Sequence, residues 1–178
     1  SYIQKDQRRE MIKTDEKYEL VVSCITENQD SLYRLALSYT KDRQSALDVV
    51  QNTVLRALES YEKLRNSVSV RPWLFKIAVN ESNRYMAKNK REIPSEPSEL
   101  PEEAYIEKAY EKGEGNAVCE AVMHLPEDMK TVVILRYFED MSLKEVAMAT
   151  DTALNTVKSR LYAAHRRLEK MLKREVEA

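Results

Sequence analysis

The stretch that decides the fold of this chain is Ser142–Lys170, which reads SLKEVAMATDTALNTVKSRLYAAHRRLEK. Its first residue and Glu145, three positions later, form the pattern of a capping box, which predicts a short helix from this point. A polar turn over Thr150–Ala153 follows, and a second helix is expected to begin at Asn155 or Thr156. A short helix, a tight turn and a longer helix are typical of a helix-turn-helix, whose second helix enters the major groove of DNA.

The second expected helix has two different faces. Apolar residues at helical spacing predict a buried stripe of Val157, Leu161, Ala164 and Leu168. The opposite face carries hydrogen-bond donors and one aromatic ring, at Lys158, Ser159, Tyr162 and Arg166. These side chains suit phosphate and base-edge contacts, although an ordinary amphipathic hairpin with a solvated basic face has the same pattern.

The composition favours an all-α fold and excludes several kinds of site. Only Gly113 and Gly115 are glycines among 178 residues, whereas phosphate-cradling loops and dinucleotide fingerprints need several at fixed offsets. Cys24 and Cys119 lie in separate apolar patterns and are expected to be buried free thiols. We therefore expect no metal site and no cofactor.

The sequence contains no apolar run of the roughly 18 residues that span a membrane, and no secretory signal. We therefore expect a cytoplasmic protein with no direct membrane insertion.

The net charge of −1 hides two basic segments separated by an acidic one. Arg71–Arg91 contains six basic residues against a single acid, Glu81. Glu92–Glu114 contains eight glutamates, and the final segment Asn155–Arg174 is basic again. Two separate basic segments favour two contacts with nucleic acid, in spite of the slightly acidic average.

The same division appears in the expected elements. Apolar stripes predict four helices in the first half, the third capped by Asp42 or Ser45 and the fourth beginning near Pro72. Three prolines in Glu92–Gly115 favour an extended linker. We expect two small helical domains, residues 12–91 and 115–174, joined by an acidic, proline-containing linker at 92–114.

Three motifs in this order resemble one protein family. Ala46–Leu58 (ALDVVQNTVLRAL), Arg71–Asn80 (RPWLFKIAVN) and NTVKSRL in the hairpin are similar to segments of the extracytoplasmic-function group of bacterial sigma factors. The resemblance runs from about Leu20 to Lys170. It implies a specificity subunit that binds promoter DNA and core RNA polymerase, through the clamp helices of the largest subunit and the flap. It also implies control by a membrane-linked anti-sigma factor.

The resemblance gives roles to three groups of residues. The resemblance implies that core polymerase binds the polar face of the third helix, although the residues alone also fit an ordinary solvated face. The residues of this face are Asp48, Gln51, Asn52, Arg56 and Glu59. Recognition and melting of the minus-ten element fall on the fourth helix and the loop before it: Arg65, Asn66, Asn80, Asn83, Arg84 and Lys88. Recognition of the minus-thirty-five element falls on the last helix: Asn155, Thr156, Lys158, Ser159, Tyr162 and Arg166.

The sequence departs from the family pattern at several of these positions. The family often has an acidic residue where Arg84 stands, and many members have glycine where Asn155 stands. Asparagine tolerates unusual turn geometry and can cap a helix, so we expect the turn before the last helix to form.

Two other functions fit parts of the sequence. A helix-turn-helix regulator that does not bind core polymerase would share the hairpin, and a helical adaptor would bind only protein. We expect no enzyme, because no serine, cysteine or histidine lies in the pattern of an activated nucleophile.

Overall fold

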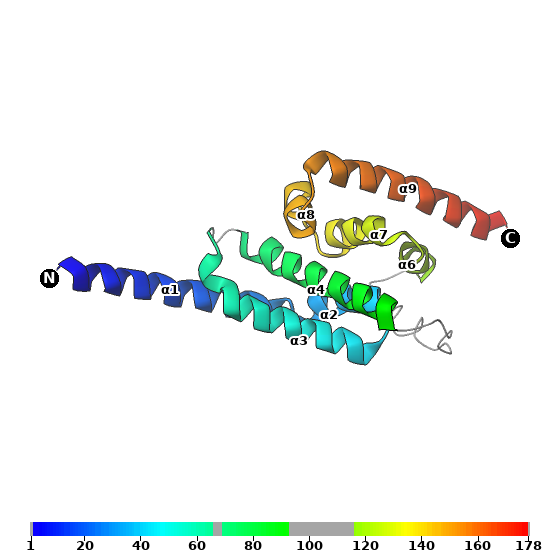
Figure 1. Cartoon of the computed structure of the whole chain (residues 1–178). Helices are drawn as coiled ribbons and strands as arrows, with labels where there is room; N and C mark the ends of the chain where they lie inside the picture. Colours follow the sequence, from blue (N-terminus) through cyan, green and yellow to red (C-terminus); the bar gives the residue numbers. More distant parts are fainter. Residues whose placement is uncertain (1, 66–68, 93–115, 178) are drawn as a thin grey trace.

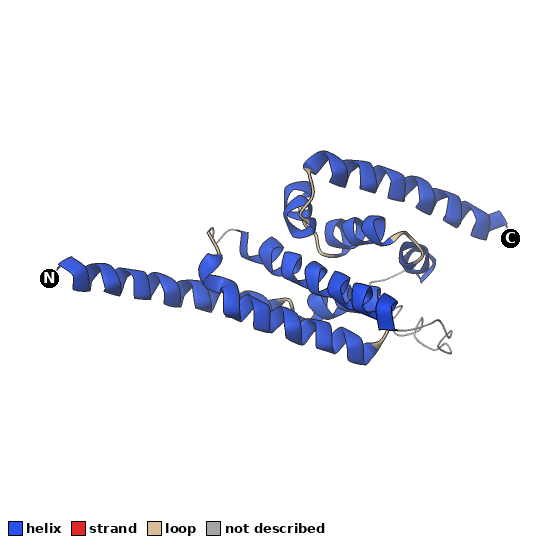
Figure 2. Cartoon of the chain, viewed as in Figure 1, coloured by secondary structure: helices blue, strands red, loops and turns tan. Residues whose placement is uncertain are grey.

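The structure of the chain is a computed structural model that describes residues 2–65, 69–92 and 116–177. Within these ranges the regular elements are helices, joined by short turns, and no strand is present (Figure 2). The helices form two groups, one before and one after residues 93–115, and the second group lies against one side of α4 (Figure 1). The expectation of an all-α fold is confirmed.

The first group contains α1 (Tyr2–Glu27), α2 (Gln29–Thr40), α3 (Arg43–Ser60), a single 3₁₀ turn η1 (Tyr61–Lys63) and α4 (Val70–Glu92). Lys41 takes a left-handed conformation after α2, with φ of 53°. Asp42 then caps α3 by accepting a 2.8 Å hydrogen bond from the backbone N–H of Ser45. Of the two caps that the sequence allowed, Asp42 is therefore the one used.

The second group contains α6 (Asn116–Met123), α7 (Glu127–Val133), a π-helical turn η3 (Ile134–Phe138), α8 (Leu143–Thr150) and α9 (Leu154–Glu177). The predicted capping box before α8 is present, since Ser142 and Glu145 each bond the other's backbone. The left-handed residue of the turn is Asp151, with φ of 52°. The expected role of Asn155 in the turn is wrong, because α9 begins at Leu154 and Asn155 lies inside its first turn.

The helix that begins with α7 changes to a π-helical turn at η3 before it ends at Phe138. The backbone N–H of Glu139 bonds the carbonyl of Ile134, five residues earlier, at 3.0 Å. A π turn of this kind is rare in proteins and often lies at a functional site. Here it sets the direction in which Glu139 leaves the helix.

Buried apolar side chains from the two groups form one hydrophobic cluster. Leu35, Leu74 and Phe75 from the first group and Ile134 and Val157 from the second are completely buried within it. Removal of this surface from water is the main force that holds helices together.

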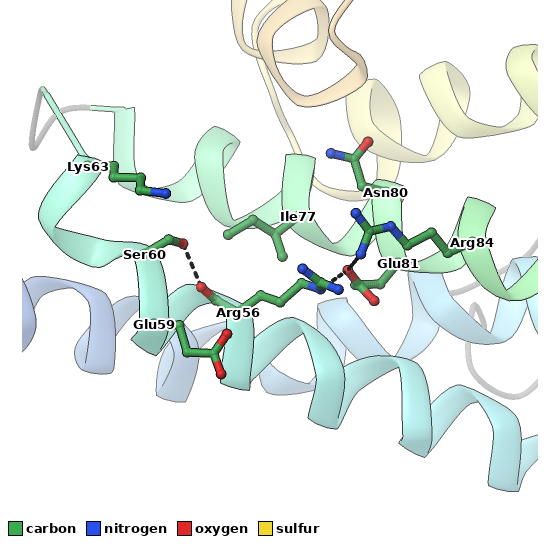
Figure 3. Close-up of a pocket in the computed structure, with 8 residues that line it drawn as sticks. All are labelled: Arg56, Glu59, Ser60, Lys63, Ile77, Asn80, Glu81 and Arg84. Atoms are coloured by element: carbon green, nitrogen blue, oxygen red, sulfur yellow. Dashed lines mark hydrogen bonds and ion pairs between the residues drawn. The ribbon is translucent and has the colours of Figure 1, made fainter.

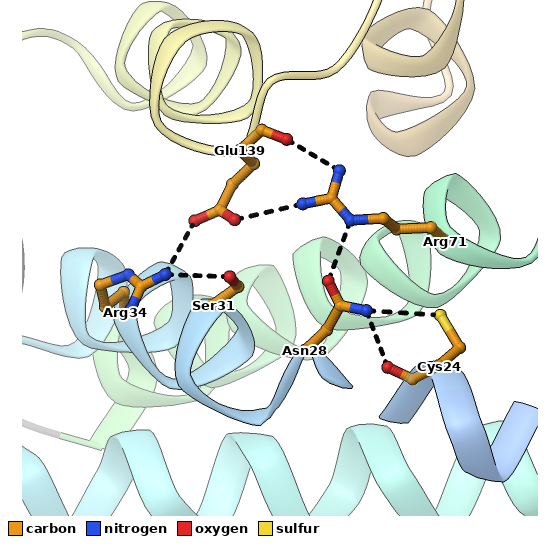
Figure 4. Close-up of polar contacts among 6 residues, drawn as sticks. All are labelled: Cys24, Asn28, Ser31, Arg34, Arg71 and Glu139. Atoms are coloured by element: carbon orange, nitrogen blue, oxygen red, sulfur yellow. Dashed lines mark hydrogen bonds and ion pairs between the residues drawn. The ribbon is translucent and has the colours of Figure 1, made fainter. Parts of the chain in front are cut away.

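Polar contacts join the two groups around Glu139, which is 4% exposed (Figure 4). Arg71 of α4 donates to the backbone carbonyl of Glu139 at 2.8 Å and to its carboxylate at 3.3 Å. Arg34 of α2 lies 3.7 Å from the other carboxylate oxygen. Asn28 accepts from Nε of Arg71 at 2.9 Å and so holds the guanidinium in place.

A second polar contact between the groups lies at the end of α2. Lys130 of α7 is 2% exposed and donates to the backbone carbonyl of Ser38 at 2.7 Å. That carbonyl lies in the last turn of α2, where carbonyls lack helical partners and a cation is favoured. Burial lowers the pKa of Lys130, while the nearby carboxylate of Glu127 acts in the opposite direction. We call the contacts of Glu139 and Lys130 the seam.

Candidate polymerase and nucleic-acid interfaces

The outer face of α3 is exposed, and the structure places there all five residues predicted to bind core polymerase: Asp48, Gln51, Asn52, Arg56 and Glu59. Two apolar side chains that the prediction missed share this surface. Leu47 is 41% exposed and Leu55 is 57% exposed, each within four residues of Gln51. Apolar side chains surrounded by polar ones are typical of protein–protein interfaces.

A cavity of about 420 Å³ lies between the end of α3 and the middle of α4 (Figure 3). Its walls are formed by eight residues: Arg56, Glu59, Ser60, Lys63, Ile77, Asn80, Glu81 and Arg84. Four of them were assigned from the sequence to two different partners. Asn80 and Arg84 were predicted to bind the minus-ten element, whereas Arg56 and Glu59 were predicted to bind polymerase. We call this cavity the α3–α4 pocket.

A buried carboxylate organises the charges of the α3–α4 pocket. Glu81 is 6% exposed, and its Oε1 forms ion pairs with Arg56 Nε from α3 and, at 3.3 Å, with Arg84 Nη1 one turn further along α4. The three side chains together carry one net positive charge. The sequence did not indicate this arrangement, because the partner of Glu81 on α3 is far away along the chain.

The other residues predicted for the minus-ten element do not belong to the lining of the pocket that the structure describes. Asn83 and Lys88 are exposed on α4, and Arg65 is exposed just beyond η1. Asn66 lies outside the described residues.

Helix α1 supports η1 and so fixes the start of the loop between α3 and α4. The ring of Tyr18 meets the ring of Tyr61 edge-on, with centroids 5.4 Å apart. Lys17 donates to the backbone carbonyl of Glu62 at 3.3 Å. These positioning contacts from α1 were not predicted from the sequence.

The outer face of α9 presents most of the residues predicted for the minus-thirty-five element. Asn155, Lys158, Ser159, Tyr162 and Arg166 are exposed, and Thr156 is half-buried. The Arg166 guanidinium lies 5.9 Å from the centre of the Tyr162 ring. A shallow cavity of about 230 Å³ follows on the same helix, and its lining adds two cations that the prediction missed: Arg167 and Lys170.

The inner face of α9 is buried as predicted at three of its four positions, and the fourth, Leu168, is half-buried. Val157 and Ala164 are inaccessible to solvent and Leu161 is 7% exposed. These residues hold the helix against α7 and α8 and leave its cationic face toward solvent. An exposed, cationic second helix in a helix-turn-helix has the geometry to enter a major groove.

Among the described residues, no group of three or more His, Cys, Asp or Glu side chains is arranged to hold a metal ion. None of the helices in those ranges combines the length and apolar character needed to cross a membrane. Both cysteines are buried, and they form no disulfide with each other.

Comparison with known proteins decides the family. Residues 24–92 match Sigma-70 region 2 and residues 116–168 match Sigma-70 region 4. The chain is 38% identical over 157 residues to the RNA polymerase sigma factor SigV of Bacillus subtilis, an alignment that covers 88% of this chain and 93% of the relative. The chain belongs to the extracytoplasmic-function family of bacterial sigma factors.

Other members of this sigma-factor family are more distant. The ECF RNA polymerase sigma-E factor of Haemophilus influenzae is 28% identical over 144 residues, covering 71% of this chain and 74% of the relative. The sigma factor RpoE, solved in complex with the anti-sigma factor NepR from Bartonella quintana, superposes with a TM-score of 0.66 at 25% identity, covering 89% of this chain and 97% of that one. CnrH, solved in complex with the cytosolic domain of CnrY, shares the fold with a TM-score of 0.63 at 16% identity, covering 88% of this chain and 97% of that one.

Proposed function

We propose that this sigma factor binds core RNA polymerase, recognises two promoter elements and assists DNA melting at the start of transcription. It acts in the bacterial cytoplasm as a specificity subunit and not as an enzyme. The observation that carries the proposal is that one chain exposes a cationic helix-turn-helix face on α9 and a separate polar, cationic pocket between α3 and α4. We assign residues 12–91 and 115–174 to the two functional domains and 92–114 to the linker.

In this proposal the α3–α4 pocket receives an unstacked nucleotide of the minus-ten element. Ile77 offers an apolar surface to the face of a base, and the Asn80 side-chain amide can both donate to and accept from a base edge. Arg65, Asn66, Asn83, Arg84 and Lys88 supply contacts to neighbouring nucleotides and phosphates. Extrusion of a base costs a few kcal/mol of stacking, which these single-strand contacts offset.

The outer face of α9 enters the major groove at the minus-thirty-five element. Asn155, Thr156, Lys158 and Ser159 lie in the first two turns of α9, where side chains reach base edges in helix-turn-helix complexes. Tyr162 and Arg166 follow, and the added cations Arg167 and Lys170 extend the phosphate contact.

The outer face of α3 docks on the clamp helices of the polymerase's largest subunit. Leu47 and Leu55 supply apolar contact area. Asp48, Gln51, Asn52 and Glu59 form the polar rim, and Arg56 lies at the edge where this surface meets the α3–α4 pocket. The second domain contacts the polymerase flap.

An anti-sigma factor, linked to the membrane, holds the protein inactive in this proposal. Its support is the similarity in fold to RpoE, which was solved with the anti-sigma factor NepR.

Run-off transcription with core polymerase and a library of promoters tests the proposed function. We expect transcripts from a subset of promoters that share two elements, and none from core polymerase alone. The absence of promoter-specific transcripts, with a housekeeping sigma factor active on the same core preparation, would refute the proposal. A regulator that only binds DNA would retard promoter fragments without core polymerase and give no transcript.

A further inference from the structure

Three charged groups in the α3–α4 pocket differ in their exposure to solvent. The Glu81 side chain is 7% exposed, whereas those of Arg56 and Arg84 are 49% and 60% exposed. Figure 3 shows the carboxylate between the two guanidinium groups. A carboxylate loses much favourable hydration on burial, so its retention in such a place requires charged or hydrogen-bonding partners.

The two ion pairs of Glu81 have different structural consequences. The pair with Arg56 joins α3 to α4, two helices that already contribute buried apolar residues to the same core. The pair with Arg84 lies within one turn of α4 and joins no two elements. Its effect is to hold the Arg84 guanidinium over the pocket, so a brace between helices does not explain both contacts.

The pairing leaves most hydrogen-bond donors of both arginines available. A guanidinium has five N–H donors, and only one nitrogen of each arginine contacts Glu81. Both arginines line the same pocket as Asn80, and their side chains are about half exposed. Arginine donors held in a fixed orientation bind phosphate oxygens in bidentate fashion.

We propose that Glu81 is the positioning residue of the α3–α4 pocket, and that it holds Arg56 together with Arg84 to bind the phosphodiester of an unstacked, single-stranded nucleotide. This role of Glu81 rests on the proposed function and extends it in two ways. Arg56 serves the DNA strand rather than the polymerase surface. A buried acid in a DNA-binding pocket strengthens DNA binding by orienting two cations.

Whether removal of the Glu81 charge weakens or strengthens DNA binding tests this proposal. Removal of a negative charge from a DNA-binding surface normally strengthens binding, because electrostatic repulsion of phosphate is lost. If Glu81 positions the arginines, Glu81→Gln has the opposite effect, and we expect single-stranded DNA to bind about threefold to tenfold more weakly. Glu62→Gln is the matched control, because it removes an exposed acid from the neighbouring turn η1. We expect unchanged or tighter binding for this control.

The experiment uses holoenzyme reconstituted with saturating full-length sigma factor. The probe is a fluorescent single-stranded oligonucleotide of the minus-ten strand, taken from a promoter selected by run-off transcription. Each variant is also measured with both arginines replaced, Arg56→Met and Arg84→Met. We expect Glu81→Gln to lose its effect in that background, because the carboxylate then has no guanidinium to orient.

Four outcomes separate the possible explanations. Tighter binding by Glu81→Gln, as for Glu62→Gln, would overturn the proposal, and so would an undiminished loss in the double-arginine background. If Glu81→Gln does not fold, as judged by helical circular dichroism, the Arg56→Met variant decides. Normal oligonucleotide binding with weakened core binding by that variant would place Arg56 on the polymerase surface and overturn the proposal. If the wild-type holoenzyme selects no promoter, the proposed function itself fails, and the inference fails with it.

Discussion

Asp42 shows how one side chain determines where an element begins. Lys41 turns the chain out of α2 in a left-handed conformation, and Asp42 then accepts from the backbone N–H and the hydroxyl of Ser45. These hydrogen bonds favour the ionised form and lower the pKa of Asp42. The start of α3, and with it the register of the surface proposed to dock on polymerase, depends on this local contact.

Replacement of the cap should therefore destabilise the protein in a pH-dependent way. We expect Asp42→Ala to lower the free energy of unfolding by about 0.5–2 kcal/mol at neutral pH, measured by urea denaturation. Because the pKa of Asp42 is lower in the folded state, the charge contributes its stability above the unfolded pKa of about 3.9 and loses it as the pH falls through the folded value.

Asp42→Asn is the matched control for this prediction, because asparagine caps a helix but does not titrate. We expect this variant to lose less stability than the wild type when the pH is lowered from about 5 to about 2. Equal losses in the two proteins would show that the Asp42 carboxylate does not contribute through its charge.

At the scale of the element, α9 combines two faces whose roles can be separated. The buried face is needed for folding, whereas the exposed face is free to bind. We expect Lys158→Ala or Arg166→Ala to weaken binding to the minus-thirty-five element by about 1–3 kcal/mol if either side chain makes a bidentate base contact. Electrophoretic mobility shift with promoter and scrambled DNA measures the difference.

Lys173→Ala provides the control for α9, since Lys173 is exposed on the same helix and pairs with Glu169 at 2.6 Å. Its removal should change affinity for both DNA sequences slightly. An equal loss on scrambled and promoter DNA for Lys158→Ala would make Lys158 a phosphate contact without sequence preference.

Helix α3 should depend on its exposed leucines for docking. We expect Leu55→Asn to weaken core-polymerase binding about tenfold or more, because central apolar contacts carry most of the energy of an interface. Fluorescence anisotropy of labelled sigma factor with core polymerase measures this affinity. Val176→Asn, at an 89% exposed position near the end of α9, is the control. Unchanged affinity for Leu55→Asn would place the interface elsewhere.

The elements could be predicted from the sequence because their causes are local. The apolar stripe of α9, the capping box at Ser142 and the proline in the first turn of α4 each depend on residues a few positions apart. The charged centre of the α3–α4 pocket could not be predicted, because Glu81 meets Arg56 only when two helices pack. The π turn was missed for a similar reason, since its apolar pattern matches an α-helix.

At the scale of the whole molecule, the seam places the two proposed DNA-binding faces close together. Lys76 of α4 and Asp151 before α9 form a 3.2 Å ion pair, and Asn80 and Asn155 each follow one of them by four residues. Four residues of chain reach at most about 15 Å, so the two faces begin within roughly 45 Å of each other. Promoter elements about 25 base pairs apart are separated by about 85 Å of B-form DNA. The two groups of helices must therefore separate before both elements are bound.

Weakening of the seam should favour that separation. We expect Glu139→Ala to increase the radius of gyration measured by small-angle X-ray scattering, because loss of one partner from a buried ion pair costs about 3–5 kcal/mol. The helical circular dichroism of both groups should be retained, since Glu139 lies between elements.

Asp151→Asn is the control for the seam. It removes the ion pair with Lys76, in which the Asp151 side chain is 76% exposed, and such surface pairs contribute little. Asparagine also tolerates the left-handed conformation at this position. A radius of gyration that is the same for Glu139→Ala and Asp151→Asn would show that the buried pair does not hold the two groups together.

The π turn at Ile134–Phe138 has a consequence for how this protein can change by mutation. A turn closed between residues five apart contains one residue more than an α-helical turn, which is closed between residues four apart. Loss of the codon for an exposed residue of this segment, such as Tyr137, would allow α7 to continue as an ordinary α-helix. The residue that follows would leave the helix in nearly the same direction, because the π turn and the shorter α turn each complete about one turn. One in-frame deletion could thus remove the π turn and keep the contacts of Glu139 with Arg34 and Arg71.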